Sequence, residues 1–341
     1  AKEVADHLGT DHHEILVTDQ EVKEIIPKLA AMYDEPFADS SQIPTHLVCK
    51  AARQKVTVAL SGDAADELFG GYNRYTWTPR IWKKFSWIPF QVRKTFGHLV
   101  TALPASILDL FGAFFNLMLP KERKITRFSD KLHKMAARFV TSETLDDFCN
   151  HMALVWDNPN DIINMIDHTE KHSDEKQSID SNLKFNDEIS QMMYRDLLTY
   201  LPDDILCKVD RAAMSVSLET RVPFLDHRVV ELSSRIPMNM KIRNNEGKWI
   251  LRELLYKYVP KKLIDRPKAG FAIPIGEWIR GPLKGWAEDL LNPEKIVSQG
   301  YFHSEPIQKM WKEHLSGDYD WTPRLWGILM FQSWLEETSF N

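Results

Sequence analysis

The stretch that most limits what this chain can fold into is 56–72, VTVALSGDAADELFGGY, where a β-branched run turns through small residues into paired acids. We expect a strand over Lys55–Leu60 that ends at this turn. Upstream, Asp19 is expected to cap a helix over residues 20–33, and a second helix is expected through His46–Arg53. Strands that alternate with helices predict a parallel α/β sheet.

The pattern changes near residue 75. Residues 1–75 also include a short expected strand over residues 12–18, whereas residues 76–341 are almost entirely helical in pattern, with Trp-rich segments and Pro-marked stops. The most apolar run, residues 103–120, is interrupted by polar residues and falls short of a membrane span. We expect it to be a buried or partner-facing helix. The sequence thus predicts a sheet-bearing part followed by a large helical part.

Composition and charge exclude several classes of protein. With 43% hydrophobic residues in a chain of 341, at least one sizeable core can form, so the chain is not a disordered segment. A formal net charge of −5 gives no basic field for nucleic acid. Cys49, Cys149 and Cys207 are isolated and odd in number, which argues against a disulfide framework or a structural zinc site. We expect a cytoplasmic protein with small-molecule substrates and without a membrane or nucleic-acid partner.

The turn after the expected strand has the composition of an anion site. Such a turn lies at the carboxyl edge of the sheet, where open α/β folds bind ligands. Ser61 and Gly62 are small enough for backbone N–H groups to approach an anion. Asp63 and Asp66 would repel a phosphate unless a divalent cation such as Mg²⁺ lay between them. The spacing alone leaves a second interpretation open, in which Asp63 caps a helix and Asp66 complements its dipole.

Five segments resemble the asparagine synthetases of the glutamine-hydrolysing type and stand in the order of that family. SGDAADELFGGY is similar to the family's pyrophosphate-contacting motif, while KVDRAAMSVSLETRVPFLDHRVVEL and RPKAGFAIPIGEWI resemble two later motifs of its synthetase domain. The five segments lie at residues 1–15, 34–45, 61–72, 208–232 and 266–279. Apart from residues 80–190, the resemblance covers most of the chain.

The resemblance implies a role for each matching position. Ser61 and Gly62 would contact the nucleotide, and Asp66 would bind Mg²⁺ and pyrophosphate. Asp63 stands where the family places a carboxylate beside the acyl-adenylate and the incoming ammonia. Lys268 matches a lysine that would stabilise charge on the reacting carboxyl and then on the tetrahedral intermediate.

One more carboxylate is expected just before the second motif, at Asp203 or Asp204, with Asp204 preferred. The implied fold is a parallel-sheet α/β fold of the ATP-pyrophosphatase type, and the implied cofactors are ATP and Mg²⁺. The implied reaction converts aspartate to asparagine through a β-aspartyl-AMP, which is attacked by ammonia supplied from glutamine. Two alternatives remain: an adenylating amidotransferase or cyclase with a different acid or amine, and a non-catalytic homologue or subunit.

Charged residues of the second motif also allow two interpretations. Lys208, Asp210 and Arg211 fit either a solvated helical face or a buried ion-pair network. Glu219 and Arg221 fit structural support of the following loop. Sequence alone does not choose between these interpretations.

The chain departs from the family pattern in three ways. It has no Ser-Gly-Gly-x-Asp-Ser loop, which holds pyrophosphate in the family, and residue 1 is alanine instead of a cysteine nucleophile. Ala64 replaces a frequent glycine and is expected to keep φ below zero at a helix start. We expect the chain to be a carboxyl-terminal piece of a longer protein, with a sheet incomplete on its amino-terminal side. Alone, it is expected to lack glutamine hydrolysis and to bind ATP poorly, and a homodimer would form through the missing glutaminase domain.

Overall fold

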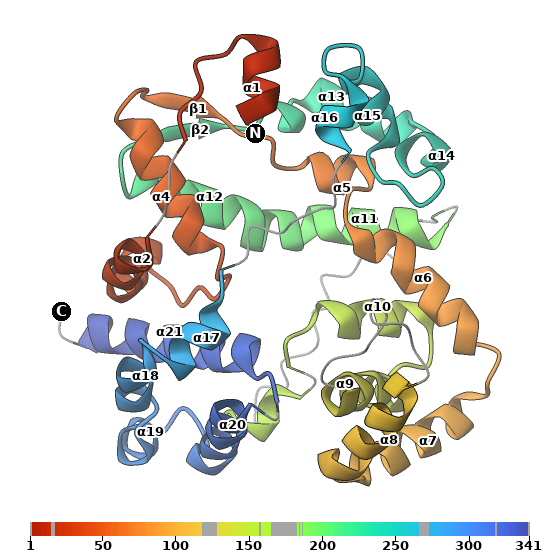
Figure 1. Cartoon of the computed structure of the whole chain (residues 1–341), viewed down its shortest axis with the longest axis vertical. Coiled ribbons are helices and arrows are strands. Elements are labelled where there is room, and N and C mark those ends of the chain that lie inside the picture. Colours follow the sequence, from red (N-terminus) through yellow and green to blue (C-terminus); the bar gives the residue numbers. More distant parts are fainter. Residues whose placement is uncertain are drawn as a thin grey trace. The chain divides into compact units, whose positions relative to one another are not determined.

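The computed structural model describes residues 2–14, 18–117, 128–156, 158–164, 183, 185, 187–265, 273–317 and 319–339. The chain divides into two compact units, each assembled from stretches that are separate in the sequence. The first unit comprises Ala1–Thr78, Gln177–Ile273 and Trp334–Asn341, and the second comprises Pro79–Lys176 and Pro274–Ser333. Figure 1 shows the elements coloured along the sequence. The expected division into residues 1–75 and 76–341 stays a prediction.

The first unit is mostly helical and includes a small parallel sheet. Its elements are α1 Lys2–Leu8, α2 Asp19–Ile25, η1 Ile26–Lys28, α3 Leu29–Tyr33, α4 Gln42–Arg53, β1 Val58–Leu60, α5 Ala65–Phe69, α11 Glu188–Leu198, η4 Leu201–Leu206, α12 Cys207–Met214, β2 Glu219–Arg221, η5 Pro223–Leu225, α13 His227–Arg235, α14 Met238–Lys241, α15 Trp249–Leu255 and α16 Lys261–Ile264. Helices α6 Asn73–Phe85 and α21 Thr322–Ser339 each contribute residues to both units.

The sheet joins two segments that are far apart in the sequence. β1 and β2 pair in parallel, with Val58 opposite Glu219. The expected parallel pairing is therefore present, but β1 is shorter than the expected Lys55–Leu60. No strand was expected at β2, because three residues are too few to show an alternating pattern. Of the other expected strand, residues 12–14 lie outside any strand, and residues 15–17 are not among the described residues.

The first long helix differs from expectation at its start and in its middle. Thr18, not Asp19, is the N-cap: its side chain accepts from the Glu21 N–H, and the Glu21 carboxylate accepts from the Thr18 N–H at 2.9 Å. This reciprocal pair is a capping box. The expected helix over residues 20–33 is divided by the 3₁₀ turn η1, because Pro27 lacks an N–H group for the helical ladder.

Among the described residues, the second unit consists of helices and one isolated antiparallel bridge between Ile163 and Phe302. Its elements are α7 Phe90–Ala102, α8 Ala105–Leu117, α9 Phe128–Thr141, α10 Leu145–Ala153, η3 Pro159–Asp161, α17 Ile275–Arg280, α18 Lys284–Leu290, α19 Pro293–Gln299 and α20 Ser304–Ser316, together with most of α21. Phe148, Ile279 and Trp326 are among its most deeply buried side chains. Helices α7 and α8 both pack against α9.

The apolar run at residues 103–120 is not a buried helix. Within it, α8 leaves Leu110, Phe111 and Phe114 exposed over 73%, 63% and 68% of their surface, while residues 118–120 lie outside the described part. The partner-facing alternative therefore remains. No single described helix is long and apolar enough to cross a membrane, whereas the bent pair α7 and α8 meets the length and composition criteria together.

The backbone at the start of α5 differs from the sequence-based expectation. Ala64 has φ +66°, so the expectation of a φ below zero is wrong. The left-handed conformation costs an L-residue roughly 1–2 kcal/mol, which explains why glycine suits this position. Packing offsets this cost, because the Ala64 methyl group is buried in a cluster with Leu68, Phe69 and Leu201.

We predict that Ala64→Gly and Ala65→Gly differ in stability, although each deletes one buried methyl group. At Ala64, relief of the left-handed conformation offsets the lost packing, so the free energy of unfolding should stay within about 1 kcal/mol of wild type. At Ala65, which is 4% exposed and lies in α5, glycine gives no such relief and weakens the helix, so the loss should be about 1.5–2 kcal/mol. Urea unfolding measures both values, and equal losses would contradict strain at Ala64.

Candidate active site

A cavity of about 470 Å³ lies at the carboxyl end of β1, within the first unit. This is the position at which open α/β folds bind ligands. Ser61, Gly62 and Asp63, all predicted from the sequence, line it together with Lys208. The remaining walls come mainly from apolar side chains of α4, α12 and the two strands. An apolar cavity with a few polar groups is the usual composition of a small-molecule site.

Both strands fix the turn that carries Ser61 and Asp63. The Ser61 N–H donates to the Arg221 carbonyl at 2.8 Å, which continues the parallel ladder by one bond. The Ser61 hydroxyl donates to the Asp63 carboxylate, and the Asp63 N–H donates back to Ser61 Oγ at 3.3 Å. Asp63 therefore orders the turn. It does not cap α5, whose N-cap residue is Ala64, so the capping interpretation of Asp63 is wrong.

Asp66 forms an ion pair that the sequence did not suggest. Its Oδ2 lies 2.8 Å from the Lys248 ammonium group, and the two side chains are 27% and 28% exposed. The Lys248 N–H donates to the Phe69 carbonyl at 3.0 Å, which joins the start of α15 to the end of α5. A Cβ at Gly71 would lie 2.1 Å from Asp66 Oδ1 and 2.3 Å from Lys248 Cε. This glycine of the first motif therefore makes room for the ion pair.

Lys248 is the candidate functional residue that sequence reasoning missed. A lysine after a turn is usually solvated, and its partner Asp66 lies far away in the sequence. The one available signal is the preceding Gly247, where a Cβ would lie 2.2 Å from the Gly70 carbonyl oxygen. A glycine before the lysine permits a close approach of two backbones, but the sequence does not show that the second backbone is that of Gly70.

A second lysine, Lys208, belongs to a buried ion-pair network. It is 8% exposed, and its ammonium group lies 2.6 Å from Asp39 and 3.8 Å from Asp204. Burial and the charge of Asp39 raise the pKa of Asp204 to about 7. Burial also opposes ionisation of Asp39, but the charge and hydrogen bond of Lys208 outweigh it and lower the pKa of Asp39. Lys208 thus takes the buried alternative, whereas Arg211 pairs with exposed Asp34 at 2.8 Å.

The backbone holds Asp204 in an uncommon conformation. Residues Leu201–Leu206 form a π-helical segment that leads directly into α12. Short π-helical segments within helices are frequent at functional sites. Asp204 Oδ1 is buried without a hydrogen-bond partner among the described residues, whereas Asp203 is exposed. A buried acceptor in this state can receive an N–H group of a ligand.

Lys268 lies outside the described residues, so its position at the cavity stays a prediction.

Within the described part of the chain, no group of three or more His, Cys, Asp and Glu side chains could hold a metal ion. Mg²⁺ is usually held by one or two carboxylates together with substrate phosphates. The Asp66 carboxylate fits that shared kind of site, although it does not form a metal site by itself.

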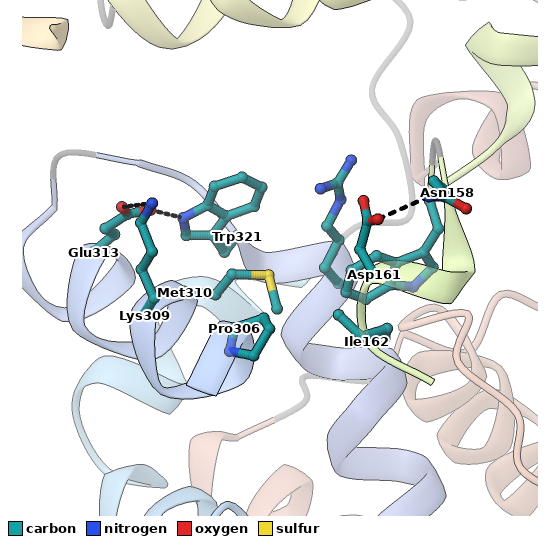
Figure 2. Close-up of a pocket in the computed structure, with 10 residues that line it drawn as sticks. Asn158, Asp161, Ile162, Pro306, Lys309, Met310, Glu313 and Trp321 are labelled. Atoms are coloured by element: carbon teal, nitrogen blue, oxygen red, sulfur yellow. Dashed lines mark hydrogen bonds and ion pairs between the residues drawn. The ribbon is translucent and has the colours of Figure 1, made fainter. Parts of the chain in front are cut away.

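Another pocket lies entirely in the second unit. Figure 2 shows it lined by Ile162, Met310 and Trp321, with Asn158 donating a hydrogen bond of 2.7 Å to Asp161. Its volume is about 220 Å³, and none of the residues predicted from the motifs lines it. The cavity at β1 is therefore the candidate active site.

A small-residue turn at the end of a parallel strand, with Lys208 on the wall of the cavity beside it, is consistent with an α/β protein whose candidate site lies at the strand end. Comparison with known proteins narrows this class. Residues 1–336 match the family model described as asparagine synthase. The chain belongs to the asparagine synthase family.

Individual relatives support the same assignment. The chain is 32% identical over 98% of its length to glutamine-hydrolyzing asparagine synthetase 1 of Bacillus subtilis, of which it covers 49%. It is 31% identical over 97% of its length to a Mycobacterium bovis protein provisionally named a glutamine-hydrolyzing asparagine synthetase, of which it covers 47%. It is 25% identical over 90% of its length to Amidase chry2 of Gibberella zeae, of which it covers 46%. The chain spans about half the length of the curated relatives it matches.

We predict that Asp204 makes stability depend on pH between about 4 and 7. The folded state binds the Asp204 proton more tightly than the unfolded state, because folding raises the pKa from 3.8 to about 7. This stabilisation is complete below about pH 4 and is lost as the pH rises towards 7. Asp39, whose pKa is lowered, contributes stability that is lost only at still lower pH.

Urea unfolding across this pH range tests the prediction. Asp204→Asn should remove the fall in the free energy of unfolding that wild type shows as the pH rises. Asp203→Asn is the matched control, because Asp203 is the exposed neighbour on the same segment, and it should keep that fall. Parallel pH profiles of wild type and Asp204→Asn would contradict a raised pKa.

Proposed function

We propose that the chain carries the amide-forming centre of an ATP-dependent asparagine synthetase. A β-carboxylate oxygen of aspartate attacks the α-phosphorus of ATP, and the bond from that phosphorus to pyrophosphate breaks. The product is β-aspartyl-AMP. Ammonia then attacks the acyl carbon, the bond to AMP breaks, and one proton leaves the nitrogen for a base. The products are asparagine, AMP and pyrophosphate.

One observation carries this proposal: the match to the family extends over residues 1–336, and its first motif lines a cavity of ligand size at the end of β1. Ser61 and Gly62 are proposed to contact the nucleotide through the turn. Asp66 is proposed to hold Mg²⁺ jointly with the phosphates, and the ion would reduce the repulsion between ATP and aspartate. Lys248, which already pairs with Asp66, is proposed to stabilise the charge on the departing pyrophosphate.

Two carboxylates are candidates for contact with the nitrogen. Asp63 is proposed to accept the proton from the attacking ammonia, as the resemblance implies. Asp204 is proposed to bind an N–H group of ammonia or of the aspartate ammonium, and its buried Oδ1, which lies 3.8 Å from Lys208 without a hydrogen bond among the described residues, supports this. Its pKa of about 7 also suits proton exchange near neutral pH. Lys268 is proposed to stabilise the reacting carboxyl and the tetrahedral intermediate.

The proposed reaction also needs a source of ammonia and an acid substrate. Glutamine is proposed as the source, through the part of the relatives' length that this chain does not span. The similarity to Amidase chry2 favours a second candidate function, in which the same adenylating site joins a different acid or amine. A non-catalytic homologue is disfavoured because Asp63, Asp66 and Lys268 are all retained.

The experiment follows AMP, pyrophosphate and asparagine formed by the natural gene product that contains this chain. It is given ATP and aspartate, with either ammonia or glutamine as the nitrogen source. One AMP per asparagine is expected. AMP formation with other acids but not with aspartate would favour the second candidate, and no AMP with any acid would reject adenylation.

We predict that Lys248→Met lowers kcat for AMP formation about 100- to 1,000-fold, because a charge that stabilises a leaving group acts mainly in the transition state. Lys268→Ala is expected to lower the same rate. Lys257→Met is the control, because Lys257 is exposed in the same unit and should leave the rate unchanged. Initial rates at varied ATP separate kcat from KM. A change in KM for ATP alone would contradict the role of Lys248 in the chemical step.

A further inference from the structure

The second unit presents an apolar face that its own core does not use. Helix α7 packs on α9 through its inner side, where Gly97 and Val100 are buried. Its outer side carries Val92, Phe96 and Leu99, which are 57%, 52% and 64% exposed. Their spacing of four and three residues places them in one stripe along the helix. This stripe is apolar but faces away from the packed side of α7.

Helix α8 also has a packed inner side and an exposed apolar outer side. Leu108 is buried with residues of α7 and α9, and Gly112 is buried on the same side. Leu110, Phe111 and Phe114 form the exposed side described above. We call the outer residues of the two helices the α7–α8 surface: Val92, Phe96, Leu99, Leu110, Phe111 and Phe114. Several large exposed apolar side chains on neighbouring helices are typical of a protein or membrane contact.

The part of the sequence that includes α7 and α8 is rich in basic residues. Residues 79–138 contain twelve Lys and Arg against three Asp and Glu, whereas the whole chain has a net charge of −5. Lys83, Lys84 and Lys94 have exposed side chains at the end of α6 and on α7. An anionic partner complements this charge. A second copy of the same surface does not, because a symmetric contact would bring like charges together.

An exposed tryptophan contacts one of these lysines, Lys84. Trp87, in the connection between α6 and α7, is 77% exposed. Its indole N–H donates to the Lys84 carbonyl at 2.8 Å, so the polar edge of the ring is already satisfied. An exposed tryptophan beside lysines is typical of side chains at the boundary between a membrane and water.

The dimensions of the two helices indicate how they would meet a bilayer. Each helix has 13 residues, which gives a length of about 20 Å, and the bilayer core is about 30 Å thick. The pair is bent by 105°. Neither helix is long enough to cross that core alone, so the bent pair would lie in the interface.

We infer that the α7–α8 surface binds the face of an anionic lipid bilayer. Its apolar side chains would enter the headgroup boundary, and Lys83, Lys84 and Lys94 would contact lipid phosphates. The lipid surface is favoured over an acidic protein because the apolar residues form two outward stripes at a bend, with a tryptophan and lysines beside them. This inference does not depend on the proposed function, since none of its residues belongs to the candidate active site.

The test measures binding of the natural gene product that contains this chain to phosphatidylcholine vesicles with and without phosphatidylglycerol, by sedimentation at low and high salt. Binding is expected only to the anionic vesicles and is expected to weaken at high salt. The triple variant Lys83→Gln, Lys84→Gln, Lys94→Gln should reduce partitioning about 100-fold, since each basic residue near such a surface contributes about fivefold. The control replaces Lys257, Lys262 and Lys312, which are exposed elsewhere, and should bind as wild type.

A second variant tests the apolar part. Phe96→Ser with Leu110→Ser and Phe114→Ser should reduce partitioning at least about tenfold, whereas the control Val297→Ser, at a residue 67% exposed on α19, should not. If the apolar variant fails to fold, the lysine variant decides alone. Equal binding to both kinds of vesicle, no binding, or binding unchanged in the lysine variant would overturn the inference. So would a dimer, seen by light scattering, that the apolar substitutions dissociate.

Discussion

The buried ammonium group of Lys208 constrains much of the first unit. An ammonium ion removed from water costs several kcal/mol unless carboxylates and hydrogen bonds compensate it. Asp39, from the 34–45 motif, supplies the close partner, and Asp204, one turn earlier on the same helical segment, supplies a second. Because the two carboxylates also repel each other, one of them keeps its proton to near neutral pH. Two motifs that are far apart in the sequence are thus held together by one cation.

This constraint explains how so small a sheet can support a binding cavity. A three-residue parallel ladder contributes only a few hydrogen bonds, each worth about 1 kcal/mol net. The strands are held instead by helices: Cys49 of α4 packs against Ala213 of α12 and against Leu218, which directly precedes β2. Lys208 and this cluster fix α4 and α12, so β2 lies beside β1. The Ser61 N–H then donates to the Arg221 carbonyl, which positions the turn.

The sequence predicted those parts of the site that depend on short, local patterns. The strand–turn–acid order around Ser61 and Asp63 is local, and the structure places both residues on the wall of one cavity. A functional role for Lys248 was not predicted, because it depends on the ion pair with Asp66 and no local sequence pattern indicates that contact. The left-handed backbone conformation of Ala64 was not predicted for a different reason. Tertiary packing of its methyl group overrides the backbone preference of alanine, and that packing comes partly from Leu201, far along the chain.

The uneven charge of the chain bears on both proposed activities. Residues 79–138 carry nine more basic than acidic residues, so the rest of the chain carries fourteen more acidic than basic ones. Since the proposed substrates ATP and aspartate are anions, the long-range field of that acidic remainder would oppose their binding. Under the proposed function, attraction must come from groups at contact distance, for which Gly62 of the Ser61 turn, Lys248 and a metal ion held with Asp66 are the proposed candidates. The basic excess lies in a segment without any motif residue, beside apolar side chains that no core requires. Substrate binding therefore does not account for it, whereas an anionic surface outside the protein does.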